Sequence, residues 1–220
     1  MELIAVNVGR PAPLHDERTG RTVPSGIRKH LVEAPTVHVG VVNIDGDGQA
    51  DLENHGGVDK AVYSYSLDHI PAWVAEIGYG AGLESPFGEN LSVRGLTEED
   101  VHIGDRWRWG DAVLEVAQPR WPCFKLGLRA GIRGLPALLI ESERSGWYAR
   151  VVTTGEAPTS GRLERIHRAP GAPTVREAFR AARGKLDRDH ALAIASFPAL
   201  ASRWQQMILM RYPEVAVRQD

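Results

Sequence analysis

The sequence is poor in cysteine, since Cys123 is the single one among 220 residues. One cysteine cannot form an intramolecular disulfide, and a disulfide-free composition is typical of a reducing compartment, so we expect a cytoplasmic protein. A zinc site built on Cys123 would need histidines at ligand spacing, which the sequence lacks. Nucleotide-binding fingerprints, Walker loops, zinc-protease helices and serine-hydrolase elbows are missing too, which excludes several common enzyme classes.

Long apolar runs are also missing. The longest, residues 137–140 with Leu135 before it, is far shorter than the roughly 20 residues of a membrane-spanning helix. Glu2 stands where a signal peptide would carry a cation. We therefore expect no association with a membrane.

Neither sign of charge is in large excess, because the sequence has 26 Lys and Arg and 28 Asp and Glu, which gives a formal net charge of −2. Proteins that bind nucleic acid as their main partner usually carry a pronounced basic surface. The balance gives no support for a nucleic-acid partner. Small groups of cations, such as Arg120 with Lys125, are either solvated surface charges or converge in space to hold one or two phosphates.

Alternation of apolar and polar residues dominates the first 170 residues and predicts strands. The expected strands are residues 2–9, 36–44, 107–109, 112–118, 147–154 and 163–167. The expected helices among them are residues 68–77 and 135–144, the second with its end marked by Gly146. Irregularly spaced strands with few helices indicate a mainly β fold, a β-barrel or curled sheet, rather than a βαβ array.

The composition changes at Ala-Pro-Gly-Ala-Pro, residues 169–173, which is typical of a linker. Three helices are expected after it, and the first begins at Thr174 with a capping box completed by Glu177. The others cover about residues 188–196 and 199–211. In the last helix a stripe with Trp204 and Met207 is interpreted as core rather than as a cofactor contact. We thus expect a domain of residues 1–169 and a three-helix module of residues 170–220.

Cys123 lies in the segment Gln-Pro-Arg-Trp-Pro-Cys-Phe-Lys-Leu, residues 118–126, between two cations. Neighbouring cations lower the pKa of a thiol, and a bound metal deprotonates it. The two prolines favour a stiff, non-helical turn that would hold a metal ligand in place. The alternative is that Cys123 is a small buried apolar residue, and the residues leave both interpretations open.

Two further segments combine glycine with polar groups. Residues 55–60 contain paired glycines whose amides can form an anion nest, to which Lys60 would add a charge. Residues 87–91 place Glu89 and Asn90 after a glycine, where they can donate to and accept from a polar ring system. Each segment is equally well explained as an ordinary loop. Residues 45–51 resemble a calcium loop but lack its essential glycine and glutamate, so we interpret them as a polar loop.

Taken together, four segments resemble the MOSC domain family in their order and separations, and within it the stand-alone YiiM-like subgroup. They are His55-Gly56-Gly57 with Asp59-Lys60-Ala61-Val62, Phe87-Gly88-Glu89-Asn90-Leu91, Gly104-Asp105-Arg106, and Gln118-Pro119-Arg120 with Pro122-Cys123-Phe124-Lys125-Leu126. The resemblance covers about residues 6–216 and implies a MOSC-type β-barrel followed by a small three-helix module. It also implies that the chain binds the molybdenum cofactor, Mo-molybdopterin, whose metal takes a cysteine thiolate.

By position, the resemblance makes Cys123 the metal ligand and the main catalytic residue. Cations would hold the phosphate and pterin oxygens of the cofactor, and the candidates are Lys29, Lys60, Arg120 and Lys125. Polar residues would orient the pterin or line the substrate mouth, and the candidates are His55, Glu89, Asn90 and Gln118, with His55 also a candidate catalytic residue.

The resemblance implies reduction of small N-hydroxylated compounds, such as hydroxylaminopurines and amidoximes, to amines. Because the chain has no flavin or nicotinamide motif, electrons would come from an external flavin or iron–sulfur reductase. One alternative is a cofactor carrier without turnover, and another is a structural β-barrel with Cys123 in its core. The C-terminal helices either form an interface, as in a homodimer, or cover the cofactor cleft.

Overall fold

The structure is a computed structural model that describes residues 1–50 and 56–213. Its main sheet has the strand order β12-β1-β7-β6-β10-β9-β8-β13, with β4 paired to β1 outside this path. The strands are β1 (Glu2–Val8), β4 (His30–Leu31), β6 (Val62–Ser66), β7 (Leu91–Arg94), β8 (Arg106–Trp109), β9 (Ala112–Pro119), β10 (Trp147–Thr153), β12 (Gly161–Arg162) and β13 (Glu164–His167).

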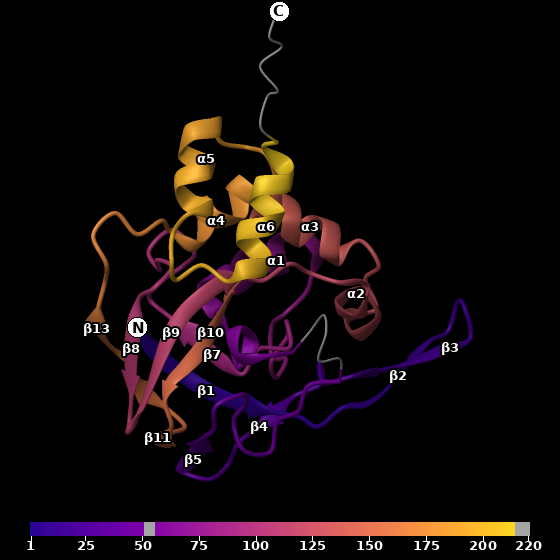
Figure 1. Cartoon of the computed structure of the whole chain (residues 1–220). Helices are drawn as coiled ribbons and strands as arrows, with labels where there is room; N and C mark the ends of the chain where they lie inside the picture. The colour runs from indigo at the N-terminus through magenta and orange to yellow at the C-terminus, as the bar shows by residue number, and fades with distance from the viewer. Residues whose placement is uncertain (51–55, 214–220) are drawn as a thin grey trace, which may run out of the picture.

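The sheet curls into a half-barrel (Figure 1). Its two edge strands, β12 and β13, are separated along the chain by Leu163 alone, so the sheet has to bend far enough to bring both edges together. The backbone amide of Leu163 donates to the carbonyl of Met1, which joins this corner to the start of β1. A mainly β fold with a curled sheet is thereby confirmed.

Most predicted strands are present, and two differences are informative. The strand expected at residues 36–44 is half as long, because β5 (Thr36–Val39) ends where the chain turns and the amide of Gly40 donates to the carbonyl of Asn43. β5 then pairs with β11 (Gly155–Pro158), which the alternation did not predict. A hairpin of β2 (Ala12–Asp16) and β3 (Arg21–Ser25) was also missed, and it extends away from the body in Figure 1.

The connection between β6 and β7 is a crossover, because these strands pair in parallel while the other strand pairs of the described sheet are antiparallel. A 3-10 helix, η2 (Leu67–His69), and then α1 (Ile70–Ile77) fill this connection. A second 3-10 helix, η1 (Val58–Lys60), precedes β6. The predicted helix at residues 68–77 is thus correct for α1.

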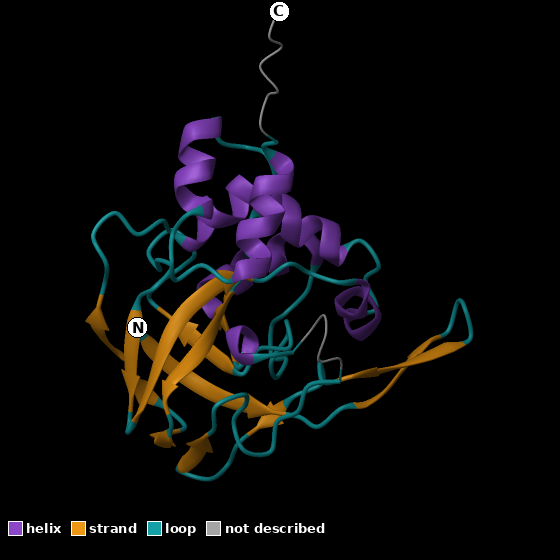
Figure 2. Ribbon diagram, viewed as in Figure 1, coloured by secondary structure: helices purple, strands orange, loops and turns teal. Residues whose placement is uncertain are grey.

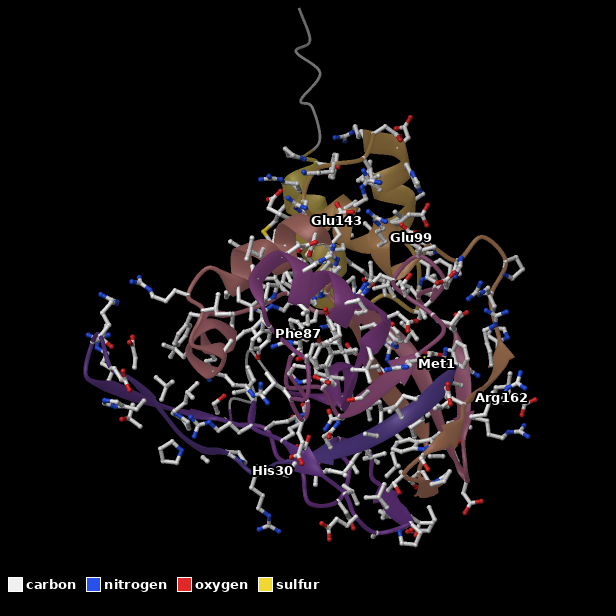
Figure 3. The ribbon with its side chains drawn as sticks, turned by 180° about the vertical axis from the view of Figure 1, so that it is seen from behind. Met1, His30, Phe87, Glu99, Glu143 and Arg162 are labelled. Atoms are coloured by element: carbon white, nitrogen blue, oxygen red, sulfur yellow. The ribbon has the colours of Figure 1, made fainter. Side chains whose placement is uncertain are left out.

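The helix predicted at residues 135–144 is α3 (Leu135–Ser142), which ends two residues earlier than predicted, and the residue that ends it is not Gly146. The helix ends at Glu143, which adopts a left-handed backbone with φ 60°. The buried Glu143 carboxylate accepts from Arg176 Nε at 2.8 Å and lies 3.5 Å from Arg180 Nε. This ion cluster offsets the strain of the left-handed residue and attaches α3 to the C-terminal helices, beside which Figure 3 shows Glu143.

The C-terminal helices are α4 (Val175–Ala182), α5 (Arg188–Ala195) and α6 (Ser202–Arg211), and they gather at one end of the curled sheet (Figure 2). The predicted capping box is confirmed, since Glu177 N donates to Thr174 Oγ1 at 3.0 Å and Thr174 N donates to Glu177 Oε2 at 2.8 Å. The buried apolar faces of these helices belong to the same core cluster as the half-barrel. The expected division of the chain at residue 169 stays a prediction.

Among residues 1–50 and 56–213, no helix combines the length and apolar character that a crossing of a bilayer requires.

Candidate functional site

Cys123 lies at the junction between the sheet and a helix that the sequence did not predict, α2 (Phe124–Ala130). Its backbone is extended, with φ −120° and ψ 168°, so the expected non-helical geometry is confirmed at this residue. The side chain is half-buried and lines two cavities instead of belonging to an apolar core cluster. A thiol in this position is accessible to a ligand from two sides.

The first cavity has a volume of about 90 Å³, and its lining includes several cationic side chains and two glycines. We call it the polar cavity. Its walls come from the end of β3 and the residues after it, the 47–50 loop, β6, and the start of α2. Its lining residues are Ser25, Gly26, Ile27, Lys29, Asp47, Gly48, Gln49, Ala50, Lys60, Tyr63, Asn90, Arg120, Cys123, Lys125 and Tyr148. The structure therefore brings together six of the residues that the sequence singled out.

Arg120 is a buried cation, 6% exposed, in the wall of the polar cavity. Its guanidinium lies 4.6 Å from the centre of the Tyr63 ring and donates a hydrogen bond to the carbonyl of Phe87. Among the described residues, no carboxylate forms an ion pair with it. Burial alone would lower the pKa of Arg120. The interactions with Tyr63, Tyr148 and Cys123 outweigh burial and raise the pKa above its ordinary value, so the guanidinium stays charged. A buried charge of this kind favours an anionic ligand.

Lys29 is less available than its charge suggests. Its ammonium pairs with Asp47, and both side chains are nearly fully buried. Burial lowers the pKa of Lys29, while Asp47 opposes that effect. Asp47 also accepts from Gly9 N at 2.9 Å and from Asn90 Nδ2 at 2.8 Å. The Lys29–Asp47 pair thus fixes the loops around the polar cavity and adds little net charge to it.

Asn90 lines the polar cavity and also joins several strands. Its Oδ1 accepts from Tyr63 N at 3.0 Å, and its Nδ2 donates to the Asn7 carbonyl at 3.1 Å. These bonds tie β6 and β1 to the residue that precedes β7. Because its amide is largely satisfied within the protein, Asn90 shapes the cavity more than it offers free donors.

Glu89 is fully buried and lies outside the lining of both cavities. Its carboxylate accepts from Phe87 N at 3.0 Å and from Ser92 Oγ at 3.0 Å. These bonds hold the loop whose Phe87 carbonyl accepts from Arg120. Figure 3 shows Phe87 near the middle of the molecule. Glu89 is therefore placed to support Arg120 instead of contacting a ligand.

Glu89 provides a pH-dependent test of this arrangement. Burial raises the pKa of Glu89 above its ordinary value of 4.5. Since the folded protein holds this proton more tightly than the unfolded chain, Glu89 contributes stability below pH 4.5, and this contribution is lost as the pH rises through the raised pKa. Gln has no carboxyl group to ionise, so the free energy of unfolding of Glu89→Gln should increase relative to that of the wild type as the pH rises through the raised pKa of Glu89. Urea unfolding of both proteins across the acidic to neutral range measures the difference, and a difference independent of pH would contradict the prediction.

The remaining predicted residues take different places. Lys125 lines the polar cavity and donates to the Pro24 carbonyl at 3.0 Å, which links α2 to β3. Lys60 lines both cavities, and the buried Gln118 lines the second. His55 lies outside the described residues.

The second cavity has a volume of about 440 Å³ and shares Lys60, Cys123 and Tyr148 with the polar cavity. We call it the aromatic cavity. It is lined by Lys60, Gln118, Trp121, Pro122, Cys123, Tyr148, Arg203, Trp204 and Met207. The prediction that Trp204 belongs to the core is confirmed, but Trp204 and Met207 also reach this cavity. Their helical spacing alone gave no signal of that second role.

Sequence reasoning missed several residues of the site. Asp47 was part of the segment interpreted as a polar loop, and its alternating carboxylates were the available signal. Tyr63 and Tyr148 pack with ring centres 4.9 Å apart and both line the polar cavity. Tyr63 ends the glycine-containing segment that begins at His55 but was given no role there, and Tyr148 belongs to no motif. They come from β6 and β10, which become neighbours only in the sheet.

A metal ion without an organic cofactor would have few protein ligands here. In the described part of the chain, no group of three or more His, Cys, Asp and Glu residues could hold a metal. A metal bound at Cys123 would therefore need most of its ligands from elsewhere. This donor set, one soft thiolate beside a cationic cavity, fits a metal that is carried by an anionic cofactor.

Comparisons with known proteins agree with this site. The model of the family described as MOSC domain matches residues 51–164, which include Cys123, seven of the 15 residues that line the polar cavity and six of the nine that line the aromatic cavity. MOSC domains are generally associated with molybdenum cofactor binding.

Individual relatives match over most of the chain. Protein YiiM of Escherichia coli (strain K12) is 33% identical over 190 residues, covering 86% of this chain and 84% of that protein. The crystal structure of YiiM from Geobacillus stearothermophilus superposes with a TM-score of 0.79 at 31% identity, covering 96% of this chain and 98% of that one. A protein named Reductase from Gibberella moniliformis is 35% identical over 188 residues, and the match covers 81% of this chain but only 32% of that protein. This chain therefore belongs to the MOSC domain family and is a homologue of YiiM.

Proposed function

We propose that this protein is a molybdenum cofactor-dependent oxidoreductase that reduces N-hydroxylated compounds to amines. The observation that carries the proposal is the position of Cys123 between a cationic cavity and an aromatic one. The first suits an anionic cofactor and the second suits an organic substrate. A thiolate between them would hold a metal where both meet.

The residues of the polar cavity fit the cofactor. Arg120 is buried without a carboxylate partner among the described residues, and Lys60 and Lys125 add cations for phosphate and pterin oxygens. Gly26 and Gly48 present bare backbone, and a Cβ added at Gly26 would lie 2.5 Å from the Gly48 carbonyl oxygen. Exposed peptide groups can pair with the polar edge of a pterin.

When bound, the cofactor would supply the two electrons of the reduction, held by Cys123 and by the cations that line the polar cavity. The overall reaction balances as R–NHOH plus two electrons and two protons, giving R–NH₂ and water. The protein contributes binding, orientation and proton donors. Lys60 and Tyr148 line both cavities. Burial raises the pKa of Tyr148, so its hydroxyl stays protonated at neutral pH and can donate to a substrate oxygen.

Electrons would come from a separate flavin or iron–sulfur reductase, since this sequence contains no flavin or nicotinamide motif. The fungal protein named Reductase supports this division, because two thirds of its length has no counterpart in this chain. A partner protein would supply here what additional domains can supply in a longer chain.

The direct test is turnover. The protein is produced in a host that synthesises the molybdenum cofactor and, as a control, in one that cannot. Each preparation is incubated with benzamidoxime and a reduced viologen dye, and amidine is quantified by mass spectrometry. We expect amidine from the loaded protein alone. Stoichiometric molybdenum without any amidine would contradict the enzyme and favour a carrier.

A further inference from the structure

We infer that helix α6 and Trp121 form the specificity wall of the substrate site, and that the aromatic cavity takes the planar ring of an aromatic N-hydroxylated substrate. The residues that determine acceptance are Trp121, Trp204 and Met207. This inference rests on the proposed function and extends it, since it assigns a role to the C-terminal helices and a class of substrate to the site.

The position of the aromatic cavity supports this role. Cys123, Tyr148 and Lys60 line it and the polar cavity alike, so a molecule in one lies next to a molecule in the other. Its volume of about 440 Å³ lies in the range of small-molecule sites. A ring seated there would place an attached N-hydroxyl group beside the Cys123 thiolate.

The wall is built from aromatic rings that are held in place. Trp204 is 3% exposed and fixed in the core, and its ring centre lies 6.1 Å from that of Trp121 in an edge arrangement. Trp121 also stacks on Phe179 with ring centres 5.5 Å apart, yet it remains 43% exposed. A rigid tryptophan with an uncovered face is a suitable surface for stacking a planar ligand.

Met207 completes the wall from the same face of α6, three residues after Trp204. Its side chain is half-buried. A thioether makes favourable contacts with ring edges and adapts to different shapes. The wall thus combines fixed rings with one flexible contact, which suits a class of related aromatic substrates better than one unique molecule.

The polar groups of the cavity narrow the class further. The described residues that line the aromatic cavity include two cations, Lys60 and Arg203, and no carboxylate. Gln118 and Tyr148 add neutral hydrogen-bonding groups. A neutral or anionic ring is therefore favoured over a cationic one.

The inference is tested by a substitution that fills the aromatic cavity, Met207→Trp, which places a large ring in it. The matched control is Met210→Trp on the same helix, because Met210 is 76% exposed and lies outside this cavity. Benzamidoxime and acetamidoxime serve as an aromatic and an aliphatic substrate. We expect Met207→Trp to raise the KM for benzamidoxime roughly tenfold, as the loss of a ring contact would. We expect the KM for acetamidoxime and the molybdenum content to be unchanged, and Met210→Trp to behave as wild type.

Binding to the cofactor-free protein gives a readout that does not depend on turnover. Benzamidoxime should quench the tryptophan fluorescence of the wild type and of Met210→Trp, but not that of Met207→Trp. Equal losses for both amidoximes, loss of molybdenum in Met207→Trp, or no quenching in the wild type would each overturn the inference. Quenching without any turnover would support the pocket and contradict the proposed function, so the two failures are distinguishable.

Discussion

Cys123→Ala is expected to reduce bound molybdenum from near-stoichiometric amounts to background and to abolish turnover. The physical reason is that Cys123, the proposed metal ligand, lines both cavities, and the described residues offer no cluster of other ligands that could replace it. A cofactor held only by cations and hydrogen bonds would exchange with solvent, because the metal–thiolate bond would be missing. Elemental analysis after gel filtration measures the loss.

The fold should survive this substitution. Cys123 is half-buried and belongs to neither of the apolar clusters, so its replacement opens no core cavity. We expect the free energy of unfolding of the cofactor-free protein to change by less than about 1 kcal/mol. Phe124→Ala is the matched control, because Phe124 is the adjacent residue and 60% exposed, and it should keep its molybdenum. Molybdenum retained by Cys123→Ala would refute the assignment of the metal ligand.

Local patterns predicted the parts of the fold that depend on neighbours along the chain. The strands β8 and β9 follow from alternation on both sides of a short turn, and the structure pairs them as a hairpin in which Trp109 lies opposite Ala112. The start of α4 follows from Thr174 and Glu177, which bond each other within one turn. The same holds for Cys123, whose prolines and cations lie within a few residues of it.

The elements that were missed lack such patterns for physical reasons. All five residues of β6 are buried, so this strand shows no alternation between apolar and polar faces. Helix α2 contains Gly127, which lowers helix propensity. A Cβ at Gly127 would lie 3.0 Å from the Ile132 carbonyl oxygen, so the close approach of the following turn favours glycine there.

Most of the site residues that were missed are determined by tertiary structure. Tyr148 lies on β10 and reaches the cavities because β10 pairs with β6 and β9. Trp204 lines the same cavity as Cys123 only because α6 lies at this end of the sheet. Periodicity assigns Trp204 to a buried face, which is correct, but it does not show that the same face also lines a cavity.

Arg120→Met is expected to weaken retention of the cofactor by roughly 10- to 100-fold, because a hydrogen bond to a charged group contributes about 1.5–3 kcal/mol. In the cofactor-free protein two effects of this substitution oppose each other. The Phe87 carbonyl loses its donor and Tyr63 loses a cation contact, but a buried charge without a carboxylate partner among the described residues also disappears. We therefore expect a small change in the unfolding free energy without cofactor and a large loss of the stabilisation that the cofactor adds.

Arg129→Met is the control that separates these effects. Arg129 donates to the carbonyls of Pro86 at 2.8 Å and Glu84 at 2.9 Å, in the loop that also receives Arg120, but it lines neither cavity at Cys123. It should lower the melting temperature equally with and without cofactor and leave the molybdenum content unchanged. Thermal denaturation of loaded and cofactor-free preparations of both variants makes the comparison. If both variants lost cofactor to the same extent, Arg120 would act by supporting the loop, and its buried charge would not be the group that holds the anionic ligand.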